Sequence, residues 1–589
     1  MDSLLKIMTD TVSAAFSACG YDASFAKVTI SNRPDLCEYQ CNGALSAAKQ
    51  YHCAPMVIAE AVAAELQKSA VFAAAEAVRP GFLNLTVSPE TIAAFLQQES
   101  ADAYLGTARL GEGKTIILDY GGANVAKPLH VGHLRSAVIG ECLKRVCRYL
   151  GYHAIGDVHL GDWGLQMGLI IEELHSRRPE LPYFDPAFTG EYPAEAPFTI
   201  SDLEEIYPAA SGRSKTDAEF AALAHEATHR LQQGDRGYTA LFRHILNVSR
   251  KDLEKNYANL NVSFDLWKGE SDVQPYIEDM IADFRAKGLL VESQGAQVIP
   301  VEEETDTKEV PPCIIQKSDG AYLYATTDLA TLVEREKLYH PDEYFYTTDK
   351  RQAMHFVQVF RAARKAGILR PETPAVHLGF GTMNGKDGKP FKTRDGGVMR
   401  LEYLLKDIAD AVYERMAAQT EMPEEEKRKT AAIIGLAALK YGDLSNQAAK
   451  DYVFDIDRFA SFEGNTGPYI LYTIVRISSI LEKYREKFGV TELPEGILPA
   501  QSSQEKALQL LLTRVGEVIT DTYAEKAPHK LCLYIYDVSN AFNSFYHETH
   551  ILGETDAAKQ GGYIALLALT RRVLMTVIDL LGFEAPDRM

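Results

Sequence analysis

The feature that most constrains this chain is a strand-like run followed by a helix that opens on two histidines. Residues 115–120 read Thr-Ile-Ile-Leu-Asp-Tyr, which is typical of a short buried strand. Apolar residues then recur at helical spacing from Leu134 to Leu150, and Gly151 ends the pattern. A second strand is predicted over residues 152–158. In such a β-α-β unit a ligand is expected where the first strand ends and the helix begins.

The sequence His130-Val131-Gly132-His133 lies at this junction and suits a phosphate-bearing ligand. Free backbone N–H groups and the helix dipole attract phosphate at a helix start. The two imidazoles share one face of the first turn and can donate to phosphate oxygens, while Gly132 leaves room for a flat adenine or ribose. Alone, two such histidines would more simply be surface residues. The Gly-Gly-Ala-Asn loop at 121–124 and Lys127 favour an ATP site.

A second phosphate-binding segment is predicted at residues 379–397, which are rich in glycine and lysine. A loop of this composition can close over a polyphosphate and hold it with its cations. The residues assigned to catalysis or nucleotide binding here are Lys389, Lys392, Arg394, Gly381 and Met383. Glycine and lysine also crowd ordinary turns, so the pattern alone is weak. Its position after the last part of the predicted sheet favours the functional interpretation.

Composition limits the classes of protein to which this chain can belong. The chain has 589 residues and 46% hydrophobic content, which predicts several globular domains. Its eight cysteines include no C-x-x-C pair, so we expect reduced thiols, a cytoplasmic location and no structural metal. Residues 1–20 resemble neither a secretory signal nor a transit peptide, and no apolar run is long enough to cross a membrane.

The net charge of −20 argues mildly against a nucleic-acid partner, because phosphate contacts require lysine and arginine. Any RNA would have to be held by local clusters of positive charge. Each candidate cluster is more simply explained as a solvated helix face. The candidates are Lys144, Arg145, Arg148, Lys427, Arg428, Arg571 and Arg572.

The chain divides into parts of different pattern, which together predict a multidomain α/β protein. Residues 1–105 mix helical and strand-like runs and predict a small α+β domain. Residues 112–400 alternate strands and helices, as a doubly wound parallel sheet of Rossmann type would, with an insertion at about 178–250. Residues 401–460 are predicted as connecting helices, and residues 461–589 as an all-helical domain.

The run around His130 resembles the HIGH motif of class I aminoacyl-tRNA synthetases, and its wording is similar to that of arginyl-tRNA synthetases in particular. Further segments resemble the arginyl enzymes in the same order along the chain. They read GDWGLQMG at 161–168, FDLWKGES at 264–271, YATTD at 324–328, RQAMH at 351–355 and FEGNTGPY at 462–469. The resemblance therefore covers nearly the whole chain.

This resemblance implies a role for each domain. The N-terminal domain would contact the outer corner of tRNA through Tyr39, Gln40 or Asn42. The helical tail would bind the anticodon, and its candidate contacts are Tyr469, Tyr472, Tyr546 and Met589. Residues 379–397 take the place of the KMSKS loop but depart from that consensus. Which cation replaces the second consensus lysine is therefore open, and the family suggests Lys127.

An arginine substrate requires a particular kind of pocket. Its side chain is a planar, permanently charged fork of donors, so the pocket needs carboxylates and an aromatic or amide group. By resemblance, Asn124 and Gln352 would hold the α-amino and carboxylate end. Tyr324, Asp328, Glu270 and Asp119 would hold the cationic group. Each acid taken alone is more simply a surface charge or helix cap.

The resemblance thus implies ATP-dependent ligation of L-arginine to tRNA(Arg) through an arginyl-adenylate. Catalysis would rest on His130, His133 and Lys127 with the loop cations, acting on ATP and its Mg²⁺. The family also raises a requirement for bound tRNA in the activation step. We expect a monomer with tRNA(Arg), L-arginine and ATP as partners and no membrane association. Two alternatives stay open: a smaller nucleotidyltransferase with an H-x-G-H helix start, and a catalytically silent synthetase paralogue.

Overall fold

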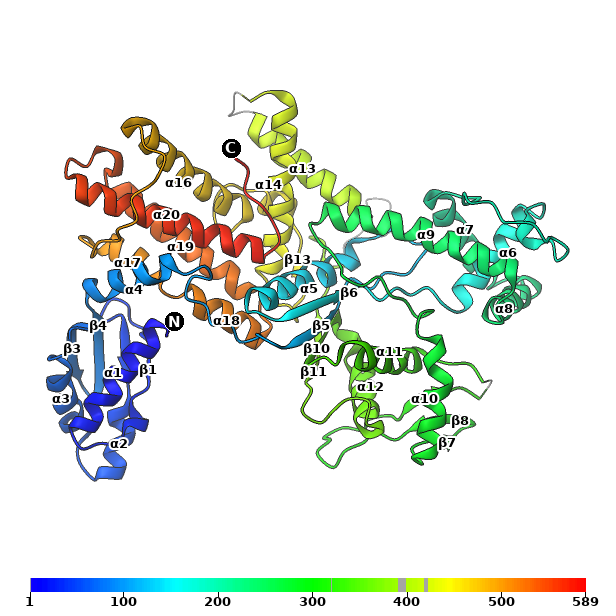
Figure 1. Ribbon diagram of the computed structural model, residues 1–589, viewed down its shortest axis with the longest axis horizontal. Helices are drawn as coiled ribbons and strands as arrows, with labels where there is room; N and C mark the ends of the chain where they lie inside the picture. Colours follow the sequence, from blue (N-terminus) through cyan, green and yellow to red (C-terminus); the bar gives the residue numbers. More distant parts are fainter. Residues whose placement is uncertain (1, 319, 390–398, 418–421) are drawn as a thin grey trace. The chain divides into compact units, whose positions relative to one another are not determined.

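The computed structural model describes residues 2–318, 320–389, 399–417 and 422–589, which form two compact units (Figure 1). The first, here called the central unit, consists of Leu110–Ser461 and Leu580–Phe583. The second, called the terminal unit, consists of Met1–Arg109, Phe462–Asp579 and Glu584–Met589. Among the described helices, none combines the length and the apolar character that crossing a bilayer requires.

The central unit is built on a parallel sheet of four strands in the order β11-β10-β5-β6. The strands are β5 (Thr115–Asp119), β6 (His153–Asp157), β10 (Glu343–Asp349) and β11 (Ala375–Phe380). From β5 the chain continues to β6 on one side, whereas β10 continues to β11 on the other. The carboxyl ends of β5 and β10 therefore flank a topological switch point, where ligands of open α/β sheets bind. This confirms the predicted Rossmann-type fold.

Helix α5 (Val131–Tyr149) connects β5 to β6, so the predicted β-α-β unit forms within a few residues of its expected bounds. Its apolar positions Leu134, Val138, Cys142 and Val146 are fully buried. The helix packs unusually close to the chain that leaves β5. A Cβ on Gly140 would lie 2.2 Å from the Tyr120 ring, so only glycine allows this approach.

Residues between β6 and β10 begin with a helical layer rather than an irregular insertion. Its helices are α6 (Leu165–Arg177), α7 (Ile200–Arg213), α8 (Ala218–Gln232) and α9 (Arg236–Asn259). They bury a small core of Leu169, Ala210, Phe220 and Ala224. The sequence predicted an insertion here, but its proline-rich composition concealed how much of it is helical.

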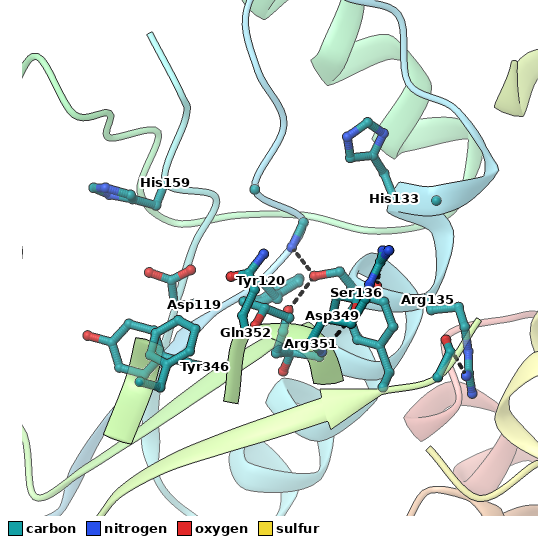
Figure 2. A pocket seen from close by; sticks show the side chains of 18 of the residues that line it. Asp119, Tyr120, His133, Arg135, Ser136, His159, Tyr346, Asp349, Arg351 and Gln352 are labelled. Carbon is teal, nitrogen blue, oxygen red and sulfur yellow. Dashed lines mark hydrogen bonds and ion pairs between the residues drawn. The ribbon is translucent and has the colours of Figure 1, made fainter. Parts of the chain in front are cut away.

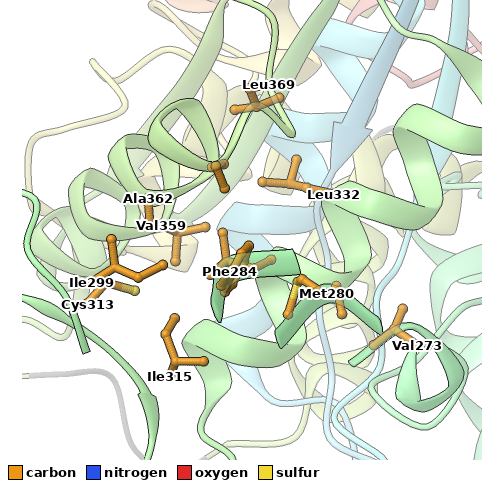
Figure 3. Packing of buried hydrophobic residues seen from close by; sticks show 14 of the residues in the cluster. Val273, Met280, Phe284, Ile299, Cys313, Ile315, Leu332, Val359, Ala362 and Leu369 are labelled. Carbon is orange, nitrogen blue, oxygen red and sulfur yellow. The ribbon is translucent and has the colours of Figure 1, made fainter. Parts of the chain in front are cut away.

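A second layer, not predicted from the sequence, surrounds a small antiparallel sheet of order β7-β8-β9. The sheet consists of β7 (Val291–Ser293), β8 (Ala296–Ile299) and β9 (Cys313–Gln316). Three helices flank it: α10 (Gln274–Ala286), α11 (Tyr324–Tyr339) and α12 (Ala353–Ala366). Figure 3 shows Phe284 at the centre of the resulting apolar core, with Met280, Ile315 and Val359 around it. This core fixes α11, which carries the predicted site residues Tyr324 and Asp328, and α12, which begins directly after the predicted Gln352.

The remaining elements of the central unit follow the sheet. They are β12 (Met383–Asn384), α13 (Leu401–Ala417), α14 (Glu424–Leu444), β13 (Tyr452–Val453) and α15 (Ile456–Phe459). β12 and β13 pair in parallel, and α13 packs on α14. Short 3₁₀ turns occur in both units at Ala23–Phe25, Pro182–Phe184, Lys350–Gln352 and Ile551–Gly553.

The terminal unit combines an α+β part with a helical part. The first part has an antiparallel sheet of order β1-β2-β4-β3. Its elements are α1 (Leu4–Ala18), β1 (Val28–Ile30), β2 (Tyr39–Cys41), α2 (Gly43–Tyr51), α3 (Pro55–Leu66), β3 (Phe72–Val78), β4 (Phe82–Val87) and α4 (Pro89–Ala101). The second part contains α16 (Gly467–Phe488), α17 (Ser503–Leu512), α18 (Val515–Glu525), α19 (His529–Glu548) and α20 (Ala557–Leu580). Lys506 pairs with Glu38, which joins the two parts.

Candidate active site

A cavity of about 840 Å³ opens at the carboxyl ends of the central strands (Figure 2). Its walls come from the ends of β5, β10 and β11, the start of α5 and the starts of α11 and α12. The structure thus brings most of the residues predicted for the nucleotide and for arginine to one place. Figure 2 shows His133 on one side of this cavity and Asp119 with His159 on the other.

The two histidines hold each other in place at the start of α5. His130 is the N-cap, and its Nδ1 accepts a hydrogen bond from the Gly132 N–H at 3.0 Å. The Nδ1 of His133 accepts one from the His130 N–H at 3.2 Å. The ring centroids are 4.0 Å apart. Because both Nδ1 atoms accept, a neutral ring carries its proton on Nε2 and offers it as a donor.

The surroundings favour the neutral form of both rings. Burial lowers the pKa of His133 to about 3, and the neighbouring His130 lowers it further. Burial and the Lys127 ammonium lower the pKa of His130 as well. Each ring therefore acts as a hydrogen-bond donor rather than as a base or a permanent charge. Such donors fit a site where negative charge develops during a reaction.

Buried side chains of α5 fix the walls around these rings. The Ser136 hydroxyl donates to the Thr347 carbonyl of β10 at 2.6 Å and accepts from the Gly121 N–H at 2.8 Å. Arg135 is 2% exposed and donates to the Gly381 carbonyl at 2.8 Å. It also pairs with the buried Asp443 at 3.1 Å. Two walls of the cavity are therefore tied to one helix.

The opposite end of the cavity is acidic, and a buried guanidinium organises it. Arg335 donates to Asp119 at 2.6 Å and to Asp157 at 2.7 Å, and its other nitrogen donates to the Tyr346 hydroxyl at 3.0 Å. Burial raises the pKa of the Asp119 carboxyl, and Arg335 opposes that shift. Asp119, Asp157 and His159 are close enough to resemble a metal site. The Arg335 guanidinium already donates to an oxygen of each carboxylate and places a positive charge between them, so this group does not fit a metal ion.

The first turns of α11 and α12 bring three more of the predicted arginine-binding residues to the cavity. Tyr324, Asp328 and Gln352 all line it. The Tyr324 side chain is 71% exposed. Asp328 is fixed differently, because the His355 ring nitrogen lies 2.5 Å from its carboxylate.

Glu270 and Asn124 lie beside this end, but neither is among the described residues that line the cavity. The Glu270 N–H donates to the Leu160 carbonyl at 3.1 Å, and Asn124 bridges to Gly161. Both residues are thus attached to the segment that follows β6. Burial raises the pKa of Glu270 to about 7, partly opposed by His159 and increased by Asp162 and Asp328. Part of this carboxyl is therefore protonated near neutral pH.

Lys127 lies at a second cavity, of about 520 Å³, which also touches His130. Its ammonium sits 4.5 Å from the centre of the Tyr207 ring, which comes from α7. Lys215 and Arg400 also line this space, and Arg400 pairs with Glu204 at 2.5 Å. The predicted catalytic lysine thus reaches the histidines from the side of the helical layer.

The predicted KMSKS-like segment is only partly described. Gly381 and Met383 are buried and line the main cavity. Lys389 is exposed at the far end of the described part. Lys392 and Arg394 lie outside the described residues. The chain that follows them is joined to the start of α5, where the Val131 N–H donates to the Met399 carbonyl at 3.1 Å.

The terminal unit gathers the predicted aromatic RNA contacts between α16 and α19. Arg476 lies 4.6 Å from the Tyr472 ring and 5.6 Å from the Tyr546 ring. Both rings are more than a third exposed. Asn543 connects Tyr469 to this group, because its amide donates to the Tyr469 hydroxyl at 2.9 Å and accepts from Arg476 at 2.8 Å. These tyrosines form one aromatic and cationic patch, here called the Arg476 patch.

Other predicted RNA contacts are placed differently. Tyr39 is 5% exposed, and burial raises its pKa to about 12, so its ring packs inside the terminal unit instead of facing a partner. Gln40 donates to Asn84 at 2.9 Å. Asn42 is exposed and Met589 is half-buried.

Several cavity residues were not predicted from the sequence. His159, Asp349, Arg351 and His355 line the cavity, and Tyr207 holds Lys127. His159 and His355 belong to, or directly precede, segments that had already been identified, so their proximity to those segments was the available signal. Tyr207 gave none, because it comes from the helical layer.

Three family models match the chain and cover nearly all of it. The model described as "tRNA synthetases class I (R), catalytic domain" matches residues 92–456. The "Arginyl tRNA synthetase N terminal domain" matches residues 3–87, and the "DALR anticodon binding domain" matches residues 470–589.

Named relatives support the same family. The chain is 57% identical to an arginine–tRNA ligase from Agathobacter rectalis and 52% identical to one from Alkaliphilus oremlandii, with 100% of each chain covered. Among solved structures, it resembles the arginyl-tRNA synthetase of Plasmodium falciparum with a TM-score of 0.81 at 24% identity, covering 100% of both chains. The Thermus thermophilus arginyl-tRNA synthetase gives 0.78 at 20% identity, covering 99% of this chain and 100% of that one. These structures support the fold.

The hydrogen bonds at the start of α5 predict the protonation state of both imidazoles. His133 should be neutral with the proton on Nε2 from about pH 8 down to about pH 5, because burial lowers its pKa to about 3, and His130 should take up a proton at a lower pH than free histidine does. Nitrogen–proton correlation spectra of ¹⁵N-histidine-labelled protein test this. His130→Gln and His133→Gln variants assign the two signals. Protonation of His133 within this pH range, or of His130 at the pH where free histidine is protonated, would contradict the prediction.

Proposed function

This chain belongs to the class I arginyl-tRNA synthetases, and we propose that the main cavity carries out both chemical steps of their reaction. The protein ligates L-arginine to tRNA(Arg) with ATP, through an arginyl-adenylate, and releases AMP and pyrophosphate. The division of labour among its residues is our proposal. The proposal rests on a chemical difference between the two ends of the cavity. One end offers hydrogen-bond donors at His130 and His133, and the other offers carboxylates at Asp119 and Asp328.

In the first step a carboxylate oxygen of arginine attacks the α-phosphorus of ATP. The bond to the β-phosphate oxygen breaks and pyrophosphate leaves. The Nε2–H groups of His130 and His133 donate to the phosphate oxygens as their charge grows. Lys127 adds a positive charge from the second cavity. Lys389, Lys392 and Arg394 would hold the departing pyrophosphate, and ATP would enter as its Mg²⁺ complex.

The acidic end orients arginine for this attack. Asp328, Asp119 and Glu270 would accept hydrogen bonds from the guanidinium, and Tyr324 would cover its plane. Asn124 and Gln352 would hold the amino acid end of the molecule. In the second step the terminal ribose hydroxyl of tRNA attacks the adenylate carbonyl carbon and AMP leaves.

The terminal unit would bind the rest of the tRNA. Anticodon bases would stack on the Arg476 patch, with Met589 beside the anticodon loop and Gln40 or Asn42 at the outer corner. Tyr39 is not part of this proposal because it is buried. We further propose that the protein acts as a monomer in the cytoplasm, where eight free thiols would stay reduced.

Charging of tRNA(Arg) with labelled arginine tests the proposed catalytic roles. His133→Ala and Lys127→Ala should each lower kcat by about two to three orders of magnitude and change the KM for ATP little, because the contact strengthens only in the transition state. His153→Ala, at the opposite end of β6, is the matched control. Activity of both site variants at the wild-type level would remove these residues from the mechanism. An inactive wild type would favour the silent paralogue.

The raised pKa of Glu270 makes arginine binding depend on pH. A guanidinium prefers the ionised carboxylate, so the KM for arginine should fall by about tenfold between pH 6 and pH 8 and then level off. In Glu270→Gln the KM should be high and nearly independent of pH in this range. The KM for ATP, measured in the same assays, is the internal control. A wild-type KM for arginine that stays constant over this range would exclude Glu270 from the pocket.

The Arg476 patch predicts which tyrosines bind RNA. Tyr472→Ala and Tyr546→Ala should each raise the KM for tRNA by about five- to a hundredfold, since a stacked base contributes about 1–3 kcal/mol. The KM for arginine should be unchanged. Tyr484→Ala is the control, because Tyr484 lies on the same helix but pairs with Phe488. Equal tRNA affinity in all three variants would show that the anticodon bases do not bind at the Arg476 patch.

A further inference from the structure

His159 is held in an uncommon backbone conformation directly after β6. Its φ is +29°, a region that residues with a side chain rarely adopt. The chain on both sides is fixed, because the Val158 N–H donates to the Leu266 carbonyl at 3.2 Å and the Leu160 N–H to the Lys268 carbonyl at 2.7 Å. Strain of this kind persists only where the surroundings impose it, and it concentrates at ligand sites.

The ring of His159 has an unmet hydrogen-bonding capacity. Both of its nitrogens are buried, and neither has a hydrogen-bond partner among the described residues. A buried polar atom without a partner is costly, so natural proteins rarely keep one without a reason. The side chain lines the main cavity at its acidic end (Figure 2). A ligand in that cavity is therefore positioned to supply the missing partner.

The neighbouring acids already have partners. Asp119 and Asp157 share Arg335, and Asp162 accepts from the Ser271 N–H at 2.9 Å and the Ser271 hydroxyl at 2.6 Å. These contacts give the three carboxylates hydrogen-bond partners but leave the imidazole of His159 without a partner among the described residues. They also fix the carboxylates around His159, whose ring nitrogen lies within 4.8 Å of Asp119 and Asp157 oxygens.

The backbone next to His159 is hydrogen-bonded to the two segments that contain the proposed arginine-binding residues Asn124 and Glu270. The Gly161 N–H donates to the Ala123 carbonyl at 3.1 Å, one residue before Asn124. The Glu270 N–H donates to the Leu160 carbonyl at 3.1 Å. His159 thus stands between the segments that position Asn124 and Glu270.

From this geometry we infer that His159 is a specificity-determining residue that accepts a hydrogen bond from the guanidinium of bound arginine. The inference rests on the proposed function of the cavity. A guanidinium has five N–H donors and no acceptor, and an imidazole nitrogen that carries no proton offers one acceptor. The strained backbone and the unpartnered ring are the cost of having this acceptor ready before the substrate arrives.

Substitution by glycine separates this role from a structural one. His159→Gly removes the acceptor and also relieves the backbone strain. We expect the KM for arginine to rise by about ten- to a hundredfold, the KM for ATP to stay within about twofold, and the Tm to stay equal or rise. His159→Asn keeps a side-chain acceptor and tolerates positive φ, so it should recover most of the arginine affinity.

The matched control is His340→Gly. His340 also has a positive φ, at +45°, but it is exposed at the end of α11. The His340→Gly variant should leave the KM for arginine and the KM for ATP unchanged. The stabilisation of the protein by arginine alone, read as a shift in Tm without ATP or tRNA, gives a second measurement, and the shift should shrink in His159→Gly only.

Two outcomes would overturn the inference. If the KM for arginine in His159→Gly equals that of His340→Gly, His159 does not touch the substrate. If the Tm falls and both KM values rise together, its role is structural. Failure of the proposed function would look different, because the wild type itself would then neither charge tRNA with arginine nor be stabilised by it.

Discussion

The buried guanidinium of Arg335 is the interaction on which the active site depends. It reaches from α11 to Asp119 at the end of β5, to Asp157 at the end of β6 and to Tyr346 of β10. Two carboxylates at neighbouring strand ends would otherwise repel each other or take up protons on burial. Arg335 offsets part of this unfavourable effect by donating to both carboxylates, and it joins three strands at the edge where the cavity opens. The position of these acidic residues is therefore set by buried contacts of the fold.

A second buried arginine does the same for the nucleotide end. Arg135 projects from α5 and donates to the carbonyls of Gly381 and Lys450, which lie about 250 and 315 residues later in the chain. The closeness of the backbone there leaves no space for a side chain, since a Cβ on Gly381 would lie 2.5 Å from Asp451. Each end of the cavity is thus fixed by one guanidinium with polar partners from distant segments, which makes both ends rigid before any substrate binds.

Sequence patterns predicted the parts of this arrangement that are local. Periodicity was enough for β5, α5 and β6 because each is buried along its length, and the Rossmann-type fold followed from that unit. It failed for β7, whose three residues are all exposed, and for β9, whose four residues alternate between buried and more exposed but are too few to give a recognisable pattern. The partners of Arg335 and the burial of Tyr39 depend on contacts between distant segments. The domain boundaries and the roles of the site residues are still predictions.

The two ends of the cavity also explain how an acidic protein can handle an anionic and a cationic substrate at once. Neutral imidazole N–H groups can donate hydrogen bonds to a polyphosphate, and Lys127 and Lys389 are the described cations assigned to that end. At the other end the excess of carboxylate attracts a cation. Polyphosphate at the acidic end would be repelled, and a guanidinium beside Lys127 would be repelled as well. In the proposed function each substrate would therefore fit in one direction only, and the carboxylate of arginine would meet the α-phosphate of ATP between the two ends.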